Sequence, residues 1–116
     1  MRHRVVRSPE AERDLESILE FLFESYLSLG DGADSAFARA AERVRGIHEA
    51  IDALGRTPRQ GTLRPELRPG LRNVTKDRAI FYFEADDEAR EVRVLAVFFG
   101  GQDHQRAMLR RVMGEG

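Results

Sequence analysis

Apolar residues recur at intervals of three or four positions through the first half of the chain, which is the period of an α-helix. The first apolar stripe contains Ala11, Leu15, Ile18, Leu19, Leu22 and Tyr26. Ser8 can cap this helix, and Pro9 suits its first turn. The sequence Gly30-Asp31-Gly32 is expected to end it.

A second stripe with the same period follows this break. Its apolar or core-facing residues are Phe37, Ala40, Ala41, Val44, Ile47, His48, Ile51 and Leu54. Asp34 or Ser35 can cap the second helix, and Gly55 can stop it. Two such helices joined by a short Gly-rich turn predict an antiparallel helical hairpin whose apolar stripes need a cover.

Shorter apolar or alternating runs outside the hairpin predict strands. Residues 2–7 form a first run, and residues 71–76 and 78–84 can pair through a short turn. Residues 91–99 are almost all apolar after the first position, which is typical of a central strand buried on both faces. Residues 102–112 predict a last short helix, with Ala107, Met108 and Val112 on one side.

The predicted order is therefore strand, helix, helix, three antiparallel strands and helix. This is an α+β fold in which an N-terminal strand and the three later strands form a four-stranded sheet beneath the helical hairpin. The chain has 116 residues, of which 41% are hydrophobic. A single domain over residues 1–116 with one modest core is expected from this length.

Composition narrows the classes of protein and site. The chain has no cysteine, which excludes disulfides and thiolate zinc sites and favours a reducing cytoplasm. No apolar run approaches the roughly 20 residues that span a bilayer, and no signal peptide is visible, so no membrane partner is expected. Three isolated histidines and a Gly100-Gly101 pair without a following Lys-Ser/Thr predict neither a metal site nor a cofactor.

The net charge of −1 conceals an asymmetry along the chain. Residues 56–78 hold two acidic and seven basic residues, the latter being Arg56, Arg59, Arg64, Arg68, Arg72, Lys76 and Arg78. This net charge of +5 predicts a surface for an acidic partner or for phosphate. A second predicted contact surface is apolar, because Phe21, Phe23 and Leu27 lie off the buried stripe of the first helix.

Three residues of the second half are candidates for chemistry. Arg72 and Arg78 lie on or beside consecutive predicted strands, so a hairpin could bring them together as a phosphate contact. The alternative is a solvated sheet face with weak ion pairs. An unperturbed imidazole at His104 could transfer protons, but His104 is also explained as the first turn of the last helix. His48 is interpreted as structural and His3 as a surface residue.

Several segments together resemble one family. Residues 6–15 read Val-Arg-Ser-Pro-Glu-Ala-Glu-Arg-Asp-Leu and resemble the opening of ParE-type toxins. Leu71-Arg72, the strands around Ile80-Phe81-Tyr82 and Val94-Leu95, and the ending Phe99-Gly100-Gly101-Gln102-Asp103-His104 also fit. In their order and spacing, these segments resemble the RelE/ParE superfamily over nearly the whole chain.

The resemblance implies the toxin of a type II toxin–antitoxin module of the plasmid-stabilisation kind. ParE-like members poison DNA gyrase, whereas RelE-like members are ribosome-dependent mRNA endonucleases. Both kinds are neutralised by a cognate antitoxin whose C-terminal segment wraps the toxin. The antitoxin expected here is ParD-like, with an acidic tail attracted to the basic loop and sheet and apolar side chains along the helical hairpin.

The residues favour the ParE-like alternative. A RelE-type nuclease would use clustered lysines and arginines with a tyrosine or histidine near the C-terminus, whereas this chain has one lysine and ends in Arg110-Arg111-Val112-Met113. The first prediction is therefore a binding-type gyrase inhibitor that performs no chemistry of its own. The alternative is an mRNA endonuclease in which Arg72, Arg78 and His104 would be catalytic.

Overall fold

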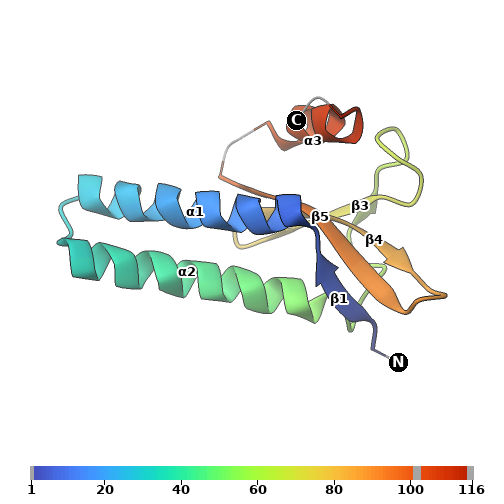
Figure 1. Cartoon of the computed structure of the whole chain (residues 1–116), viewed down its shortest axis with the longest axis horizontal. Coiled ribbons are helices and arrows are strands. Elements are labelled where there is room, and N and C mark those ends of the chain that lie inside the picture. The colour runs from blue at the N-terminus through green and yellow to red at the C-terminus, as the bar shows by residue number, and fades with distance from the viewer. Residues whose placement is uncertain (1, 101–102, 115–116) are drawn as a thin grey trace.

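The computed structural model describes residues 2–100 and 103–114. Strand β1 (Arg4–Arg7) is followed by helices α1 (Pro9–Ser28) and α2 (Ala33–Ala53), which form the helical hairpin. Strands β2 (Thr62–Leu63), β3 (Arg72–Lys76), β4 (Ala79–Asp86) and β5 (Glu91–Phe99) come next, and helix α3 (His104–Val112) ends the order. The α+β class and the helical hairpin are confirmed (Figure 1).

The sheet has five strands rather than the four predicted, in the order β1-β5-β4-β3-β2. β1 lies parallel to β5, and the other neighbours are antiparallel. The additional strand, β2, lies inside the long loop before β3 and consists of only two residues, which is too short to leave a periodic signal. β5 lies between β1 and β4 as predicted for a central strand.

A local signal sets the start of α1. Ser8 Oγ accepts a hydrogen bond of 3.0 Å from the Ala11 N–H and so caps the helix as predicted. Four residues of the predicted stripe are buried in the core: Ala11, Leu15, Ile18 and Leu22. Leu19 and Tyr26 are half-buried against the same core.

The predicted start of α2 needs two corrections. The cap is Gly32, which has no side chain to accept a hydrogen bond, rather than Asp34 or Ser35. Phe37 is 54% exposed, and Ala36 takes the buried position instead. The reason is helical spacing, because the buried stripe runs back from Ala40 by four positions to residue 36. His48 is half-buried on the same helix.

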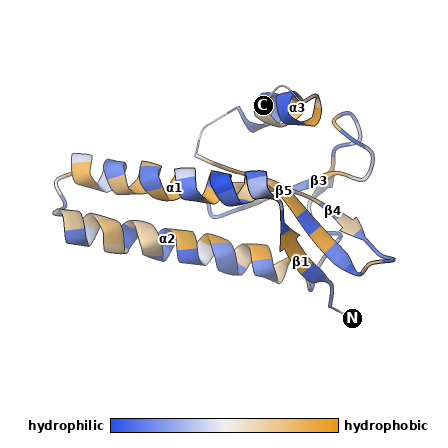
Figure 2. Ribbon diagram, viewed as in Figure 1, coloured by the Kyte–Doolittle hydropathy of each residue, from blue (hydrophilic) through white to orange (hydrophobic). Residues whose placement is uncertain are grey.

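The sheet separates two apolar cores. The larger core lies between the helical hairpin and the sheet and includes Phe81, Phe83, Val92 and Val94. The smaller core lies on the other face, where Met108 of α3 is 1% exposed and belongs to the same cluster as Tyr82. Figure 2 shows apolar and polar residues alternating along both long helices, as expected where one face of each helix is buried.

A β-bulge interrupts the pairing of β4 with β5. Tyr82 pairs with Ala96 whereas Phe83 pairs with Val94, which leaves Leu95 as the extra residue. The freed Leu95 carbonyl accepts hydrogen bonds from Ser8 Oγ at 3.3 Å and from Arg111 Nη1 at 3.2 Å. The bulge therefore connects the start of α1 and the end of α3 to one point on the central strand.

Helix α3 begins at His104, and Asp103 Oδ1 caps it by accepting from the Arg106 N–H. The start predicted at Gln102, and the Gly101-Gln102 part of the C-terminal motif, lie outside the described residues. Among the helices that the structure describes, none combines the length and the apolar character needed to cross a bilayer.

Candidate functional site

A cleft of about 680 Å³ opens between α1, the second half of β5 and α3. Its lining combines apolar residues with three arginines and one aspartate. The lining residues are Asp14, Ser17, Ile18, Phe21, Arg78, Val97, Phe98, Phe99, Gly100, Ala107, Arg110 and Arg111. In the view of Figure 1, α3 lies beyond α1, on the side of α1 away from α2.

One wall of the cleft is fixed by an ion pair between α1 and α3. The Arg111 guanidinium donates to both Asp14 oxygens, at 2.8 Å and 3.1 Å. Asp14 Oδ2 also accepts from the Val97 N–H of β5 at 2.9 Å. The hydrogen bond to Asp14 raises the pKa of Arg111 above its ordinary value. Three elements are therefore joined at one carboxylate, next to the bulge.

The opposite end of the cleft is aromatic and basic. The rings of Phe21 and Phe99 meet edge-to-face with their centroids 6.4 Å apart. Arg78 stands over the Phe99 ring at 5.8 Å, in cation–π range. Arg78 is held there by a tight turn in which it and Asp77 both adopt positive φ angles of 71° and 50°, as type I′ hairpin turns require.

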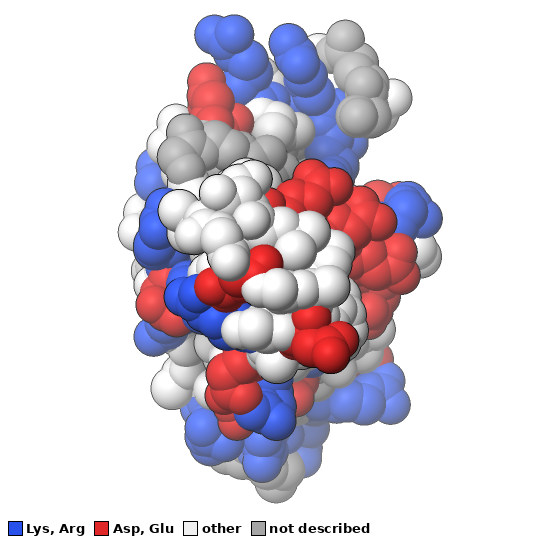
Figure 3. All heavy atoms as spheres, turned by 90° about the vertical axis from the view of Figure 1, so that its left-hand side faces the viewer, with Lys and Arg blue, Asp and Glu red and all other residues white. Residues whose placement is uncertain are grey.

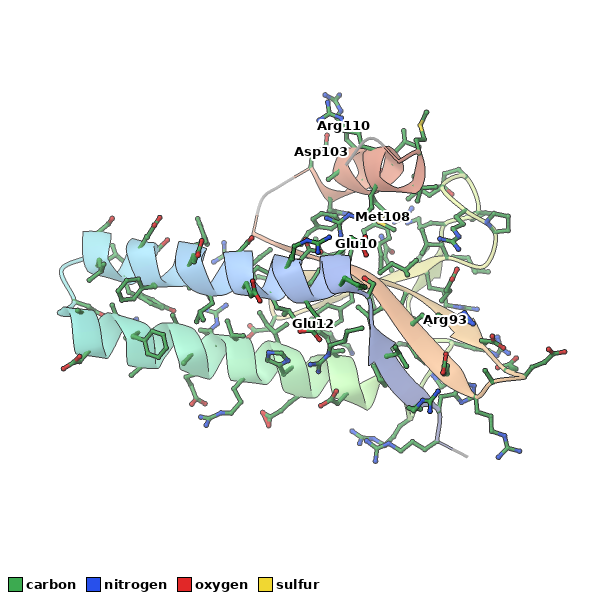
Figure 4. All side chains as sticks on the ribbon, in the orientation of Figure 1. Glu10, Glu12, Arg93, Asp103, Met108 and Arg110 are labelled. Carbon is green, nitrogen blue, oxygen red and sulfur yellow. The ribbon has the colours of Figure 1, made fainter. Side chains whose placement is uncertain are left out.

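Side chains on α3 point in two directions. Met108 points from the helix toward the sheet, whereas Arg110 extends away from it at the rim of the cleft (Figure 4). Arg110 has no ion pair among the described residues, whereas Arg111 is paired with Asp14. The cleft therefore has an apolar interior, a neutralised wall and unpaired positive charge at its rim.

A separate polar chain crosses the sheet face beneath α3. Arg64 Nε donates to Asn73 Oδ1 at 3.4 Å, and Asn73 is hydrogen-bonded to Tyr82. The Tyr82 hydroxyl lies 2.8 Å from His104 Nδ1. Because the Asn73 oxygen accepts from Arg64, the Asn73 amide nitrogen is the group that can donate to the Tyr82 oxygen. Burial raises the pKa of the Tyr82 phenol above its ordinary value of 10.0, although Asn73 opposes the shift.

The structure does not bring the three predicted catalytic residues together. Asn73 faces α3, so its neighbours Arg72 and Val74 face the other side of the sheet, where Val74 packs on the larger core. Arg72 donates to the Arg59 carbonyl at 2.7 Å on that side. Arg78 follows the far end of β3, beyond four steps of roughly 3.3 Å. The expectation that the hairpin draws Arg72 and Arg78 together is therefore wrong.

Three of the seven basic residues between positions 56 and 78 are neutralised within the chain. Arg59 is paired with Asp87, Arg68 with Glu84 at 3.5 Å, and Arg64 lies 3.9 Å from Glu66. Two of these carboxylates come from the end of β4 and the turn after it, so the count of +5 along the sequence overstates the positive charge at the surface. Within the described residues, the exposed basic side chains of this stretch without an ion pair are Arg56, Lys76 and Arg78.

The predicted apolar contacts divide between two places. Phe21 is 57% exposed and lines the cleft, and Leu27 is 38% exposed near the end of α1. Phe23 is half-buried and meets Phe37 edge-to-face at 6.3 Å. These three residues therefore do not form one continuous contact stripe.

The sequence reasoning missed the residues that hold the cleft together. No role was assigned to Asp14 from the sequence, and Arg111 was considered only as a departure from a nuclease motif. The available signal was the position of Asp14, one turn beyond the residues that usually cap a helix. The helix dipole stabilises a carboxylate only weakly there, so Asp14 needed another partner. Asn73 and Tyr82 carry no local motif. Among the described residues, no group of three or more His, Asp or Glu side chains is arranged to hold a metal.

Comparison of the fold with solved structures gives two informative likenesses. A chain of the chromosomal ParDE toxin–antitoxin system from P. aeruginosa has a TM-score of 0.62 and 22% identity, covering 84% of this chain and 95% of that one. A chain of the toxin–antitoxin complex RelBE2 from Mycobacterium tuberculosis has a TM-score of 0.60 and 18% identity, covering 88% and 95%. No family model and no curated protein matches the sequence. The chain therefore has the fold found in these complexes, as the resemblance predicted.

Proposed function

We propose that the chain is the toxin of a type II toxin–antitoxin module and that its antitoxin seats an acidic, apolar segment in the cleft between α1 and α3. The observation that carries this proposal is the chemistry of the cleft, on a fold shared with two toxin–antitoxin complexes. The proposed setting is the cytoplasm, and the proposed antitoxin is ParD-like.

The lining of the cleft supports a segment of mixed character. Its three arginines outnumber its single aspartate, and Asp14 already neutralises Arg111. Carboxylates of a partner would meet Arg78 and Arg110, while apolar side chains would cover Phe21, Phe98 and Phe99. Charged groups at the rim steer association, and the buried apolar contacts supply most of the affinity.

We further propose that the toxin acts by binding DNA gyrase rather than by cleaving RNA. The separation of Arg72 from His104 across the sheet supports this choice, because electrostatic stabilisation of a cleavage transition state needs donors converging on one point. A bound inhibitor needs only a complementary surface. The proposed effect is to hold gyrase on DNA in a state that cannot reseal or turn over.

The alternative function is a ribosome-dependent mRNA endonuclease, which one observation favours. The hydrogen bonds that run from Arg64 through Asn73 and Tyr82 end at His104 Nδ1. The contact at Nδ1 orients the imidazole and leaves Nε2 for contact with a substrate. In this alternative His104 would act as the general acid or base.

The test is controlled expression in a bacterial host, with pulse labels for DNA and protein synthesis followed in parallel. We expect DNA synthesis to stop first while translation continues. An early stop in translation would instead select the endonuclease and predict that His104→Ala removes mRNA cleavage while antitoxin binding persists. Growth with both syntheses unaffected would contradict a toxic function in that host.

The proposed seat of the antitoxin is tested by charge reversal at the rim. Arg78→Glu with Arg110→Glu is expected to weaken binding of the antitoxin encoded beside the gene by about 30- to 1,000-fold, because each arginine loses a charge-assisted hydrogen bond of roughly 1–2 kcal/mol. Arg56→Glu, on the exposed loop, is the matched control and should change affinity less than about twofold. A larger loss from Arg56→Glu than from the double rim variant would place the antitoxin on the exposed loop that contains Arg56.

A further inference from the structure

The end of the helical hairpin farthest from the sheet has a chemistry opposite to that of the cleft. We propose that this end is a docking surface for a protein partner that presents a basic, amphipathic helix. The hairpin tip is defined here by the exposed residues Leu27, Leu29 and Phe37 with the half-buried Phe23, together with Glu20, Glu24 and Asp34. This inference does not depend on the proposed toxin function.

The charge of this part of the chain is uniform. No Lys, Arg or His occurs between Arg13 and Arg39. The acidic residues in that interval are Asp14, Glu16, Glu20, Glu24, Asp31 and Asp34. Asp14 is occupied by Arg111 in the cleft, whereas Glu20, Glu24, Asp31 and Asp34 lie in the outer half of the hairpin or in its connecting turn.

The arginine nearest the tip does not offset this charge for a partner. Arg39 Nη1 donates to Asp31 Oδ2 at 2.7 Å, and its guanidinium lies 4.1 Å from the Tyr26 ring centroid. The positive charge of Arg39 is therefore neutralised by Asp31 within the hairpin. Glu20, Glu24 and Asp34 have no ion pair among the residues that the structure describes, so an approaching partner meets net negative charge.

Large apolar side chains are exposed beside these carboxylates. Leu29 is 77% exposed, Phe37 54% and Leu27 38%. Leu19, Phe23 and Leu27 follow one another at four-residue spacing along α1, beside the row Glu16, Glu20 and Glu24 with the same spacing. Figure 3, which views the molecule toward the end of the hairpin, shows uncharged side chains gathered there with acidic side chains bordering them.

The position of the tip makes it accessible. Figure 1 shows both helices running beyond the sheet, and none of the other helices and strands in the described part of the chain covers their far ends. The Phe23 and Phe37 rings meet edge-to-face across the two helices at 6.3 Å and close the gap between them. The apolar surface is therefore held by a packed pair of helices and is already formed before a partner arrives.

The negative charge of the hairpin tip distinguishes among the molecules that could bind there. A nucleic acid would bring phosphates against the carboxylates of Glu20, Glu24 and Asp34, which is unfavourable. A second copy of this chain, packed tip to tip about a two-fold axis, would place the same carboxylates against each other. A segment with an apolar stripe flanked by lysine or arginine satisfies both features of the surface, and the usual form of such a segment is an amphipathic helix in a groove.

The experiment uses a fluorescein-labelled peptide of about 15 leucines and lysines, long enough to form a helix on binding, with the leucines on one helical face. Fluorescence anisotropy measures its binding to the full chain. Glu24→Lys with Asp34→Lys, and separately Leu27→Ser with Phe37→Ser, are each expected to weaken binding at least about tenfold, or roughly 1.4 kcal/mol. Glu49→Lys with Glu88→Lys, two exposed acidic residues elsewhere, is the matched control.

Loss of binding in both tip variants, with binding kept in the control, supports the proposal. An equal loss in the control would mean that net charge alone attracts the peptide and would overturn it. Absence of binding by the parent chain would also overturn it. Self-association of the parent chain that Leu27→Ser with Phe37→Ser abolishes would assign the tip to a second copy instead. Thermal melts of each variant separate lost binding from lost folding.

Discussion

Tyr82 is the residue in which burial and hydrogen bonding oppose each other most clearly. The side chain is fully buried on the α3 face of the sheet, yet its hydroxyl has partners in both Asn73 and His104. A buried hydroxyl without partners would cost free energy, so these two contacts explain how a tyrosine is accommodated at this position.

The raised pKa of Tyr82 predicts a loss of stability at high pH. Below pH 10.0, the ordinary phenol value, both folded and unfolded chains keep the proton. Above it the unfolded chain releases the proton while the folded chain retains it, so unfolding becomes more favourable as pH rises. Denaturant unfolding at pH 8 and pH 10.5 should show this loss in the parent chain. It should be smaller in Tyr82→Phe and unchanged in Tyr26→Phe.

Asp14→Asn keeps the shape of the side chain but is predicted to lower the free energy of unfolding. Asp14→Asn removes the negative charge that binds Arg111 and weakens the acceptor for the Val97 N–H. The expected loss is about 1–3 kcal/mol of unfolding free energy, because hydrogen bonds to charged groups are being exchanged for weaker ones. Glu12→Gln, on the exposed side of α1, should stay within about 0.5 kcal/mol. Equal small losses from denaturant titrations would exclude Asp14 as a connection between elements.

At the scale of elements, the loop between α2 and β3 is fixed by one glycine. Gly61 has a φ angle of +82°, and a Cβ placed on it would lie 2.2 Å from the Asn73 carbonyl oxygen. This close approach lets the two-residue strand β2 pair with β3, opposite Asn73 and Arg72. The loop therefore follows the edge of the sheet instead of extending into solvent.

Gly70 provides a matched control for Gly61. Its φ angle of +81° is almost the same, but a Cβ there would meet nothing within 4 Å. Gly70→Ala should cost about 1–2 kcal/mol from the left-handed backbone alone, and Gly61→Ala should cost roughly 1–3 kcal/mol more from the overlap. Thermal or denaturant unfolding of the two variants measures the difference. Equal costs would mean that the edge of the sheet shifts to make room for the added Cβ at residue 61.

The elements that could be predicted from the sequence are those with local signals. Helix α1 begins at the predicted Ser8 cap. The turn before β4 occurs at Asp77 and Arg78, as expected from the short connection between the two predicted strands. Strand β2 and the true start of α2 were missed because one depends on a backbone contact distant in sequence and the other on a glycine cap. The side of the sheet on which Arg72 lies follows from strand register, which no local pattern specifies.

At the scale of the whole molecule, the two proposed surfaces have opposite charge. The rim of the cleft has Arg78 and Arg110, whereas the hairpin tip has Glu20, Glu24 and Asp34. The cleft could not be predicted because its lining comes from α1, β5, α3 and the turn before β4, which meet only after folding. The tip could have been predicted, since a stretch without basic residues is visible in the sequence.

Opposite charge predicts that the two surfaces bind different peptides independently. A leucine–glutamate peptide with the same helical pattern as the leucine–lysine probe should bind the cleft, and Arg78→Glu with Arg110→Glu should weaken it at least about tenfold. Saturating amounts of one peptide should change the affinity of the other less than about threefold, because separate sites add independently. Competition between the two peptides in anisotropy titrations would contradict two separate surfaces.

The parallel pairing of β1 with β5 has a consequence for the order of synthesis. Arg4 pairs with Glu91, and Arg7 with Val94. During synthesis, β1 is therefore made long before β5, the strand with which it pairs. The helical hairpin is made early, but the strands that cover its apolar stripes come later. Long-range pairing of this kind slows folding and leaves apolar surface open in the meantime. A chain interrupted before residue 91 would therefore lack both its central strand and the cleft, and we expect it to be inactive and readily degraded.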